Sequence, residues 1–181
     1  LCPVLDIYED NQEFYQEQRA KGKELWFYTC IGPQGEYLNR FIPYHLVKTR
    51  LIPWSVKKIG ASGYLHWGYC WWRTSDTFDS LQTGDEWLVR PDVKNYDVFS
   101  SVRNEAQLDG IEDYELITLL EKQDADAAAK IVDTMITSAT VYTRDGESAQ
   151  EAHKALLDLL TGEEADPVAV PIFSENFSSG F

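Results

Sequence analysis

The sequence predicts a parallel α/β fold followed by a group of helices, and three observations predict it. Before residue 72, short apolar segments alternate with helical ones in the order strand, helix, strand, helix, strand. Residues 24–31 (ELWFYTCI) form an almost continuous apolar and aromatic run, which is typical of a parallel strand buried on both faces. After residue 100, apolar residues recur at helical intervals instead.

The elements before residue 72 are short and bounded by glycine or proline. Gly22 ends the first helix, and GASG at residues 60–63 ends the second. Pro53 lies inside the second helix, where a proline removes a backbone donor and is expected to kink it. The predicted elements are a strand end at residues 4–8, a helix at 11–23, a strand at 24–31, a helix at 44–59 and a strand from Gly63.

The chain changes character after residue 72. Residues 73–101 are polar and rich in turns, which predicts a long loop with a short hairpin around residues 87–89. Loops of this length in compact domains are usually functional or cover something. Three helices follow, at residues 101–122, 126–138 and 148–160; Ser101 can cap the first and Gly162 ends the third.

Composition excludes several classes of function. The 181-residue chain has a formal net charge of −14, whereas nucleic-acid binding needs clustered Lys and Arg. No stretch approaches the ~18 consecutive apolar residues of a membrane helix. The three cysteines are scattered, without metal spacing or a disulfide framework. We therefore expect a soluble chain with no nucleic-acid or membrane partner, no metal and no cofactor.

Acidic pairs and histidines are the first candidates for catalytic groups. The pairs are Glu9 with Asp10, Asp85 with Glu86, and Glu112 with Asp113; each is interpreted as structural, because it lies at a helix start, in a glycine turn or in mid-helix. His45 and His153 are expected to face solvent or to cap helices. The chain also lacks a phosphate-binding loop and a nucleophile elbow. The residues alone therefore reveal no complete catalytic set.

Aromatic residues are the most informative feature. Four of the six tryptophans fall between residues 54 and 72, and residues 63–72 read GYLHWGYCWW. These rings could form a plain aromatic core, or they could stand at the carboxyl ends of parallel strands, where ligands bind. A pyranose has an apolar C–H face and a polar rim, which such rings complement.

Several segments taken together resemble one family. They are LWFYTCIGPQGEYLNRF, KTRLIPWSVKKIGASGYLHWGYCWW, GDEWLVRP and SVRNEAQLDGIEDYELITLLEK. In order and spacing they resemble the C-terminal part of the catalytic domain of family 123 glycoside hydrolases, and the related uncharacterised domain of their relatives. The resemblance covers residues 1–160. The sequence departs from the family at Cys70, where members tend to have Asn, and at Pro53, in a helix that members usually continue.

The resemblance implies about the last three β/α units of a (β/α)₈ TIM barrel, followed by C-terminal helices. A whole barrel needs eight strands and about 250 residues. We therefore expect the remainder of the barrel, or another copy of the chain, to cover the open sheet edges. An apolar start without Met agrees with a longer parent chain. The predicted divisions are a partial barrel at residues 1–100, closing helices at 101–162 and an extended or disordered tail at 163–181.

The implied activity is cleavage of β-linked N-acetylgalactosamine from glycans, with retention and with the substrate's own 2-acetamido group as nucleophile. An adjacent Asp and Glu serve this reaction in the family, from a strand that precedes the matched segments. None of the three acidic pairs has that context, so no catalytic residue is assigned to this chain. The alternative is a non-catalytic carbohydrate-binding or structural accessory domain. The compartment stays open, with secretion or a periplasmic location compatible with glycan degradation.

We expect aromatic side chains near the strand ends to bind the sugar, with Trp67 as the platform beneath it. Strand alternation places His66 and Trp67 on opposite faces, so only one should face the site unless the strand end twists or bulges. Four charged residues are interpreted as structural ion-pair or capping groups, namely Arg50, Arg103, Asp113 and Glu115. The predicted substrate-binding residues are Tyr28, Asn39, His66, Trp67, Tyr69 and Trp72.

Overall fold

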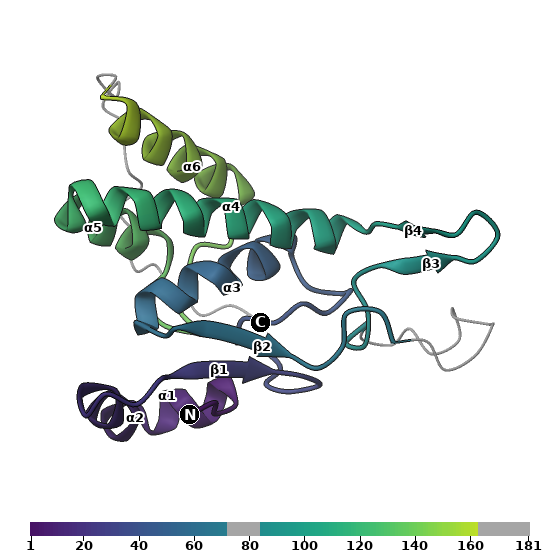
Figure 1. The fold of residues 1–181 in the computed structure, drawn as a ribbon, viewed down its shortest axis with the longest axis horizontal. Coiled ribbons are helices and arrows are strands. Elements are labelled where there is room, and N and C mark those ends of the chain that lie inside the picture. The colour runs from purple at the N-terminus through teal and green to yellow at the C-terminus, as the bar shows by residue number, and fades with distance from the viewer. Residues whose placement is uncertain (72–83, 163–181) are drawn as a thin grey trace, which may run out of the picture.

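The computed structural model describes residues 1–71 and 84–162. Within these residues a parallel strand pair, an antiparallel hairpin and several helices form a mixed α/β fold (Figure 1). In chain order the elements are α1 (Leu5–Asp10), α2 (Gln12–Ala20), β1 (Trp26–Thr29), α3 (Leu46–Ile59), β2 (Gly63–His66), β3 (Arg90–Asp92), β4 (Asp97–Phe99), α4 (Val102–Gln123), α5 (Ala125–Met135) and α6 (Gly146–Thr161).

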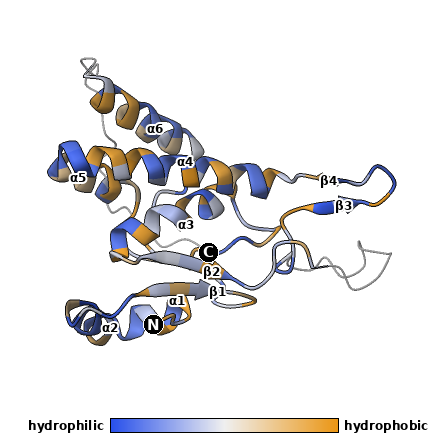
Figure 2. Ribbon diagram, in the orientation of Figure 1, coloured by the Kyte–Doolittle hydropathy of each residue, from blue (hydrophilic) through white to orange (hydrophobic). Residues whose placement is uncertain are grey.

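The elements are arranged in layers. Figure 1 shows α1 and α2 beside β1, α3 over the strand pair, α4 across α3, and α6 beyond α4. Hydrophobic and hydrophilic residues alternate along α4 and α6 (Figure 2), as expected for helices that each bury one side. The β3–β4 hairpin extends from the start of α4, away from these layers.

The parallel strand pairing predicted from the sequence is confirmed. β1 and β2 are joined through α3, and Phe27 pairs with Tyr64 in the register. Burial of β1 on both faces is wrong, since the strand alternates between exposed and buried positions. Phe27 and Thr29 are fully buried, whereas Trp26, on the opposite face, is 36% exposed. One face of the strand pair is therefore open within the described residues.

The predicted strand end at residues 4–8 is mostly a helix. Only Val4 pairs as a strand, in an isolated parallel bridge with Tyr28, and α1 begins at the next residue. The reason lies in the spacing of the apolar residues. Leu5 and Tyr8 are three residues apart and both buried, so a helical turn places them on the same side of the segment.

Helix α3 runs through Pro53 as one element. It ends where predicted, at Gly60, which adopts the left-handed conformation at φ 69°. The N–H groups of Gly60 and Ala61 return to the carbonyls of Lys57 and Val56, which satisfies the last turn. The helix is thereby fixed directly before β2.

The helices after residue 100 agree with the sequence pattern. The Ser101 hydroxyl caps α4 by accepting the Asn104 N–H, and Gly162 follows α6 in the left-handed conformation. The predicted hairpin is displaced, because residues 87–89 instead lie against the segment after β2, and the hairpin is formed by β3 and β4. Residues 163–181 lie outside the described residues.

Asp113 joins three helices in the core. Its fully buried carboxylate accepts hydrogen bonds from Arg50 Nε at 2.8 Å, Trp54 Nε1 at 3.0 Å and His153 Nδ1 at 2.6 Å. The expected structural role of Arg50 and Asp113 is confirmed, but His153 binds this carboxylate rather than facing solvent. Nearby, a Cβ on Gly110 would lie 2.1 Å from the Arg50 carbonyl oxygen, so only glycine allows α3 and α4 to approach this closely.

We predict that Asp113→Asn lowers the free energy of unfolding by about 3–5 kcal/mol, because it leaves the Arg50 cation without its buried partner. Urea unfolding followed by circular dichroism measures this change. Glu112→Gln removes the neighbouring exposed carboxylate and should change stability by no more than about 0.5 kcal/mol. Equal effects of the two substitutions would contradict the role of Asp113.

Candidate functional site

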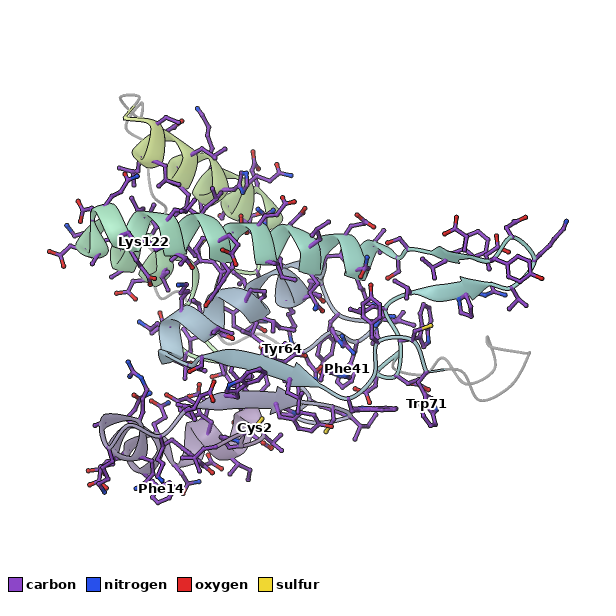
Figure 3. All side chains as sticks on the ribbon, in the orientation of Figure 1. Cys2, Phe14, Phe41, Tyr64, Trp71 and Lys122 are labelled. Carbon is purple, nitrogen blue, oxygen red and sulfur yellow. The ribbon has the colours of Figure 1, made fainter. Side chains whose placement is uncertain are left out.

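The candidate site lies at the carboxyl ends of β1 and β2. Because these strands are parallel, both end at the same edge of the sheet. Figure 3 shows Tyr64 on β2 and Trp71 beyond the end of that strand. The aromatic run that dominates the sequence therefore begins in a strand and continues past its carboxyl end.

Residues 84–89 return to this edge and place Asp85 there. The Leu88 N–H donates to the Tyr69 carbonyl at 2.8 Å, and the Trp71 N–H donates to the Glu86 carbonyl at 3.0 Å. Gly68 permits the contact, since a Cβ at this position would lie 2.8 Å from the Glu86 carbonyl oxygen. The two segments are held together by their backbones, independently of their side chains.

The Asp85 carboxylate binds two neighbouring rings at once. Oδ1 lies 3.0 Å from His66 Nε2, and Oδ2 accepts from Trp67 Nε1 at 2.8 Å. Asp85 is 3% exposed, and the two ring planes lie within 19° of each other. The expected separation of His66 and Trp67 on opposite faces does not hold, because β2 ends at His66 and the chain bends at Trp67.

Arg40 fixes the protonation state of His66. Its Nη2 lies 2.6 Å from His66 Nδ1, and the Gly68 N–H donates to the same nitrogen at 3.1 Å. Since both partners are donors, Nδ1 must accept, and Nε2 carries the proton that is donated to Asp85. Burial, together with the Arg40 charge, lowers the pKa of His66, although the hydrogen bond to Asp85 opposes that shift. His66 is therefore a neutral bridge between a buried cation and a buried carboxylate.

Arg103 connects this network to α4. Its guanidinium donates to the carbonyls of Arg40 at 2.6 Å, Gly84 at 2.8 Å and Trp87 at 2.8 Å. Burial lowers the pKa of Arg103 to about 10. Arg103 therefore has the structural role expected of it. Its guanidinium holds together the two segments that carry Arg40 and Asp85, by donating to backbone carbonyls of both.

Tyrosines on the strands flank His66. The Tyr64 hydroxyl lies 2.7 Å from Thr29 Oγ1, and burial raises the pKa of Tyr64 to about 12. Tyr28 is half-buried, with its ring 6.4 Å from that of His66, and its pKa is raised mainly by desolvation. Both phenols thus stay protonated at neutral pH and can donate a hydrogen bond.

Exposed aromatic rings surround the end of β2. Trp67 is 47% exposed, and its ring meets that of Trp71 edge-on at 5.9 Å between centroids. Tyr69 is also exposed and donates to Asn104 Oδ1 at 3.1 Å. These rings present apolar faces and hydrogen-bonding edges to solvent, which is the combination that a sugar ring requires.

The predicted binding residues are only partly brought together. Tyr28, His66 and Trp67 meet at the strand ends, with His66 buried beneath the surface. Tyr69 follows two residues after Trp67, and its hydroxyl contacts Asn104 of α4. Asn39 is fully buried, and its amide donates to the carbonyls of Cys30 and Pro33, closing the turn after β1. Trp72 lies outside the described residues.

Sequence reasoning missed Arg40 and Asp85 as members of this site. Arg40 stands at the end of LNR in one segment that resembles the family, and Asp85 opens DEWLVRP in another. A signal was thus present, but it did not show that the two residues lie on opposite sides of His66. Arg40, His66 and Asp85 lie in three separate segments of the chain, and these segments meet only in the folded structure.

The residues that the structure describes contain neither a cluster suited to a metal ion nor a helix suited to cross a membrane. In residues 1–71 and 84–162, no His, Cys, Asp or Glu cluster of three or more is arranged to hold a metal ion. None of the helices in these ranges has the length and apolar character needed to cross a membrane. The aromatic cluster at the strand ends stays the candidate site among these residues.

Comparisons with known proteins give one family. The family model for the glycoside hydrolase 123 catalytic domain matches residues 2–120, well over half of the chain. The structure is similar to a family 123 glycoside hydrolase from Clostridium perfringens that was analysed for glycolipid glycan hydrolysis, with a TM-score of 0.58 and 16% sequence identity. The similarity covers 89% of this chain but only 31% of that enzyme. No curated protein matches the sequence.

We predict that stability falls as the pH is lowered through 6.5, the ordinary pKa of histidine. The folded-state pKa of His66 is lowered, so the unfolded chain takes up the proton first. The stability gained from neutral His66 is fully present above 6.5 and is lost between 6.5 and the lower folded value.

Urea unfolding on both sides of pH 6.5 tests this dependence. His66→Gln should reduce the slope of unfolding free energy against pH, whereas His45→Gln, which removes an exposed histidine, should retain it. An unchanged slope in His66→Gln would show that another group is responsible.

Proposed function

The chain belongs to glycoside hydrolase family 123, and on this premise we propose that it supplies sugar-binding aromatic walls to a glycan-cleaving enzyme. One observation carries the proposal. An exposed indole, that of Trp67, stands at the carboxyl end of a parallel strand and is held there by a buried carboxylate. Such an indole offers a fixed apolar face, with polar groups at its edge.

The proposed architecture is the last three β/α units of a (β/α)₈ barrel, with closing helices after residue 100. Its support is the order of the parallel pairings. Val4 pairs with Tyr28 of β1, β1 pairs with β2, and a helix follows each of the first two segments. The open face carries Trp26 and Leu65, both exposed, where a barrel would place the side chains of its interior. The remainder of the barrel, or another copy of the chain, would cover that face.

The proposed substrate is a glycan with β-linked N-acetylgalactosamine, cleaved with retention by the substrate-assisted mechanism of the family. Trp67 would stack on the sugar, while Tyr28 and Tyr69 would supply hydroxyl groups at its rim. The Clostridium perfringens relative was analysed for glycolipid glycan hydrolysis, so a lipid-linked glycan belongs to the same substrate class. Catalytic carboxylates would come from a part of the enzyme other than these 181 residues.

A non-catalytic carbohydrate-binding module is the second candidate, and one observation favours it. The carboxylate nearest to Trp67 in the network, Asp85, has both oxygens engaged by ring N–H groups. Asp85 is also only 3% exposed, so its carboxylate is not accessible to a substrate. Hydrolysis of an aryl β-N-acetylgalactosaminide by the chain would exclude this candidate, whereas sugar binding without hydrolysis agrees with both.

We predict that Trp67→Ala weakens binding of methyl β-N-acetylgalactosaminide by about tenfold, or roughly 1.4 kcal/mol, because the stacking surface is lost. Isothermal titration calorimetry measures the dissociation constant. Tyr96→Ala is the matched control, since Tyr96 is 97% exposed on the distant hairpin turn and should leave affinity unchanged. Equal affinity of Trp67→Ala and the wild type would overturn the proposed platform.

A further inference from the structure

Trp67 needs something besides the backbone to fix its ring. It lies one residue beyond β2, and its side chain is about half exposed. An exposed side chain of this kind samples several rotamers and loses that freedom when a ligand packs on it. Any contact that fixes the ring beforehand reduces this entropic cost and so strengthens sugar binding.

We propose that Asp85 is a positioning residue that sets the orientation of the Trp67 indole for sugar stacking. This inference rests on the proposed function, because it concerns the same sugar site. The contact that carries it is the 2.8 Å hydrogen bond from Trp67 Nε1 to Asp85 Oδ2. Asp85 would act through Trp67 without touching the sugar.

Asp85 is itself held firmly enough for this role. Its second oxygen is bound by His66 Nε2, and the opposite nitrogen of that ring faces Arg40. Arg103 holds the adjacent backbone through the Gly84 carbonyl. A Cβ on Gly84 would lie within 2.6 Å of the Ile42 side chain, so the loop is also packed tightly at this point. The carboxylate is therefore fixed on the side away from Trp67.

An asparagine at position 85 cannot replace both contacts. The amide has one oxygen, whereas His66 Nε2 and Trp67 Nε1 both donate. His66 cannot exchange its tautomer, because Arg40 and Gly68 both donate to Nδ1. An unpaired N–H costs most where water cannot reach it. The amide introduced by Asp85→Asn would therefore keep the buried His66 contact and turn its NH₂ toward Trp67, which frees the indole.

The experiment compares Asp85→Asn with Glu86→Gln, which removes the neighbouring negative charge without touching Trp67. Binding of methyl β-N-acetylgalactosaminide should weaken about five- to tenfold in Asp85→Asn. This fold-change corresponds to the net contribution of one lost hydrogen bond. Binding should be unchanged in Glu86→Gln. In ¹⁵N–¹H spectra, Asp85→Asn should also shift the Trp67 indole resonance, which Trp67→Phe identifies by its loss.

A second replacement keeps Asp85 and its bond to His66 intact. Incorporating 3-benzothienylalanine at position 67 preserves the size of the ring but puts sulfur in place of the N–H, and affinity should fall as in Asp85→Asn. Wild-type affinity in either variant would overturn the positioning role while leaving the proposed function in place. A wild-type chain that binds no sugar would instead refute the proposed function, and this inference with it.

Discussion

The carboxylate of Asp85 is buried, and a buried carboxylate is stable only where hydrogen-bond donors replace the water it has lost. Three separate segments of the chain meet this requirement at one edge of the sheet. His66 and Trp67 supply ring N–H donors, and Asp85 supplies the carboxylate that accepts them. Arg40 binds the opposite nitrogen of the His66 ring. The exposed Trp67 ring at the end of β2 is held by this buried charge network beneath it.

The same requirement organises the core at Asp113. That carboxylate is met by donors from α3 and from α6, and it lies on α4, so one buried charge fixes the packing of three helices. Helix α3 then determines where β2 begins, because Gly60 ends the helix directly before the strand. Arg103, in the first turn of α4, reaches from this helical layer to the carbonyls around the site. Fold and site are therefore connected through α4 as well as through the sheet.

Much of this arrangement could be predicted from the sequence, because local signals determine it. Gly60, Ser101 and Gly162 mark helix boundaries through backbone conformation and capping, which depend on neighbouring residues alone. The strand predicted at residues 4–8 is wrong because a short apolar run fits both a strand and one helical turn. Two-sided burial of β1 is wrong because the sequence cannot show whether a second layer covers the strand. The roles of Arg40 and Asp85 could not be predicted, since they depend on contacts between segments far apart in the chain.

A chemical-shift map of the chain titrated with methyl β-N-acetylgalactosaminide tests the central claim most directly. If the strand-end aromatic cluster binds the sugar, the largest changes should fall on the Trp67 indole and on the backbone of Tyr28 and Tyr69, with the β3–β4 hairpin unaffected. Changes confined to the hairpin or to the outer helices, or no changes at saturating sugar, would contradict the account.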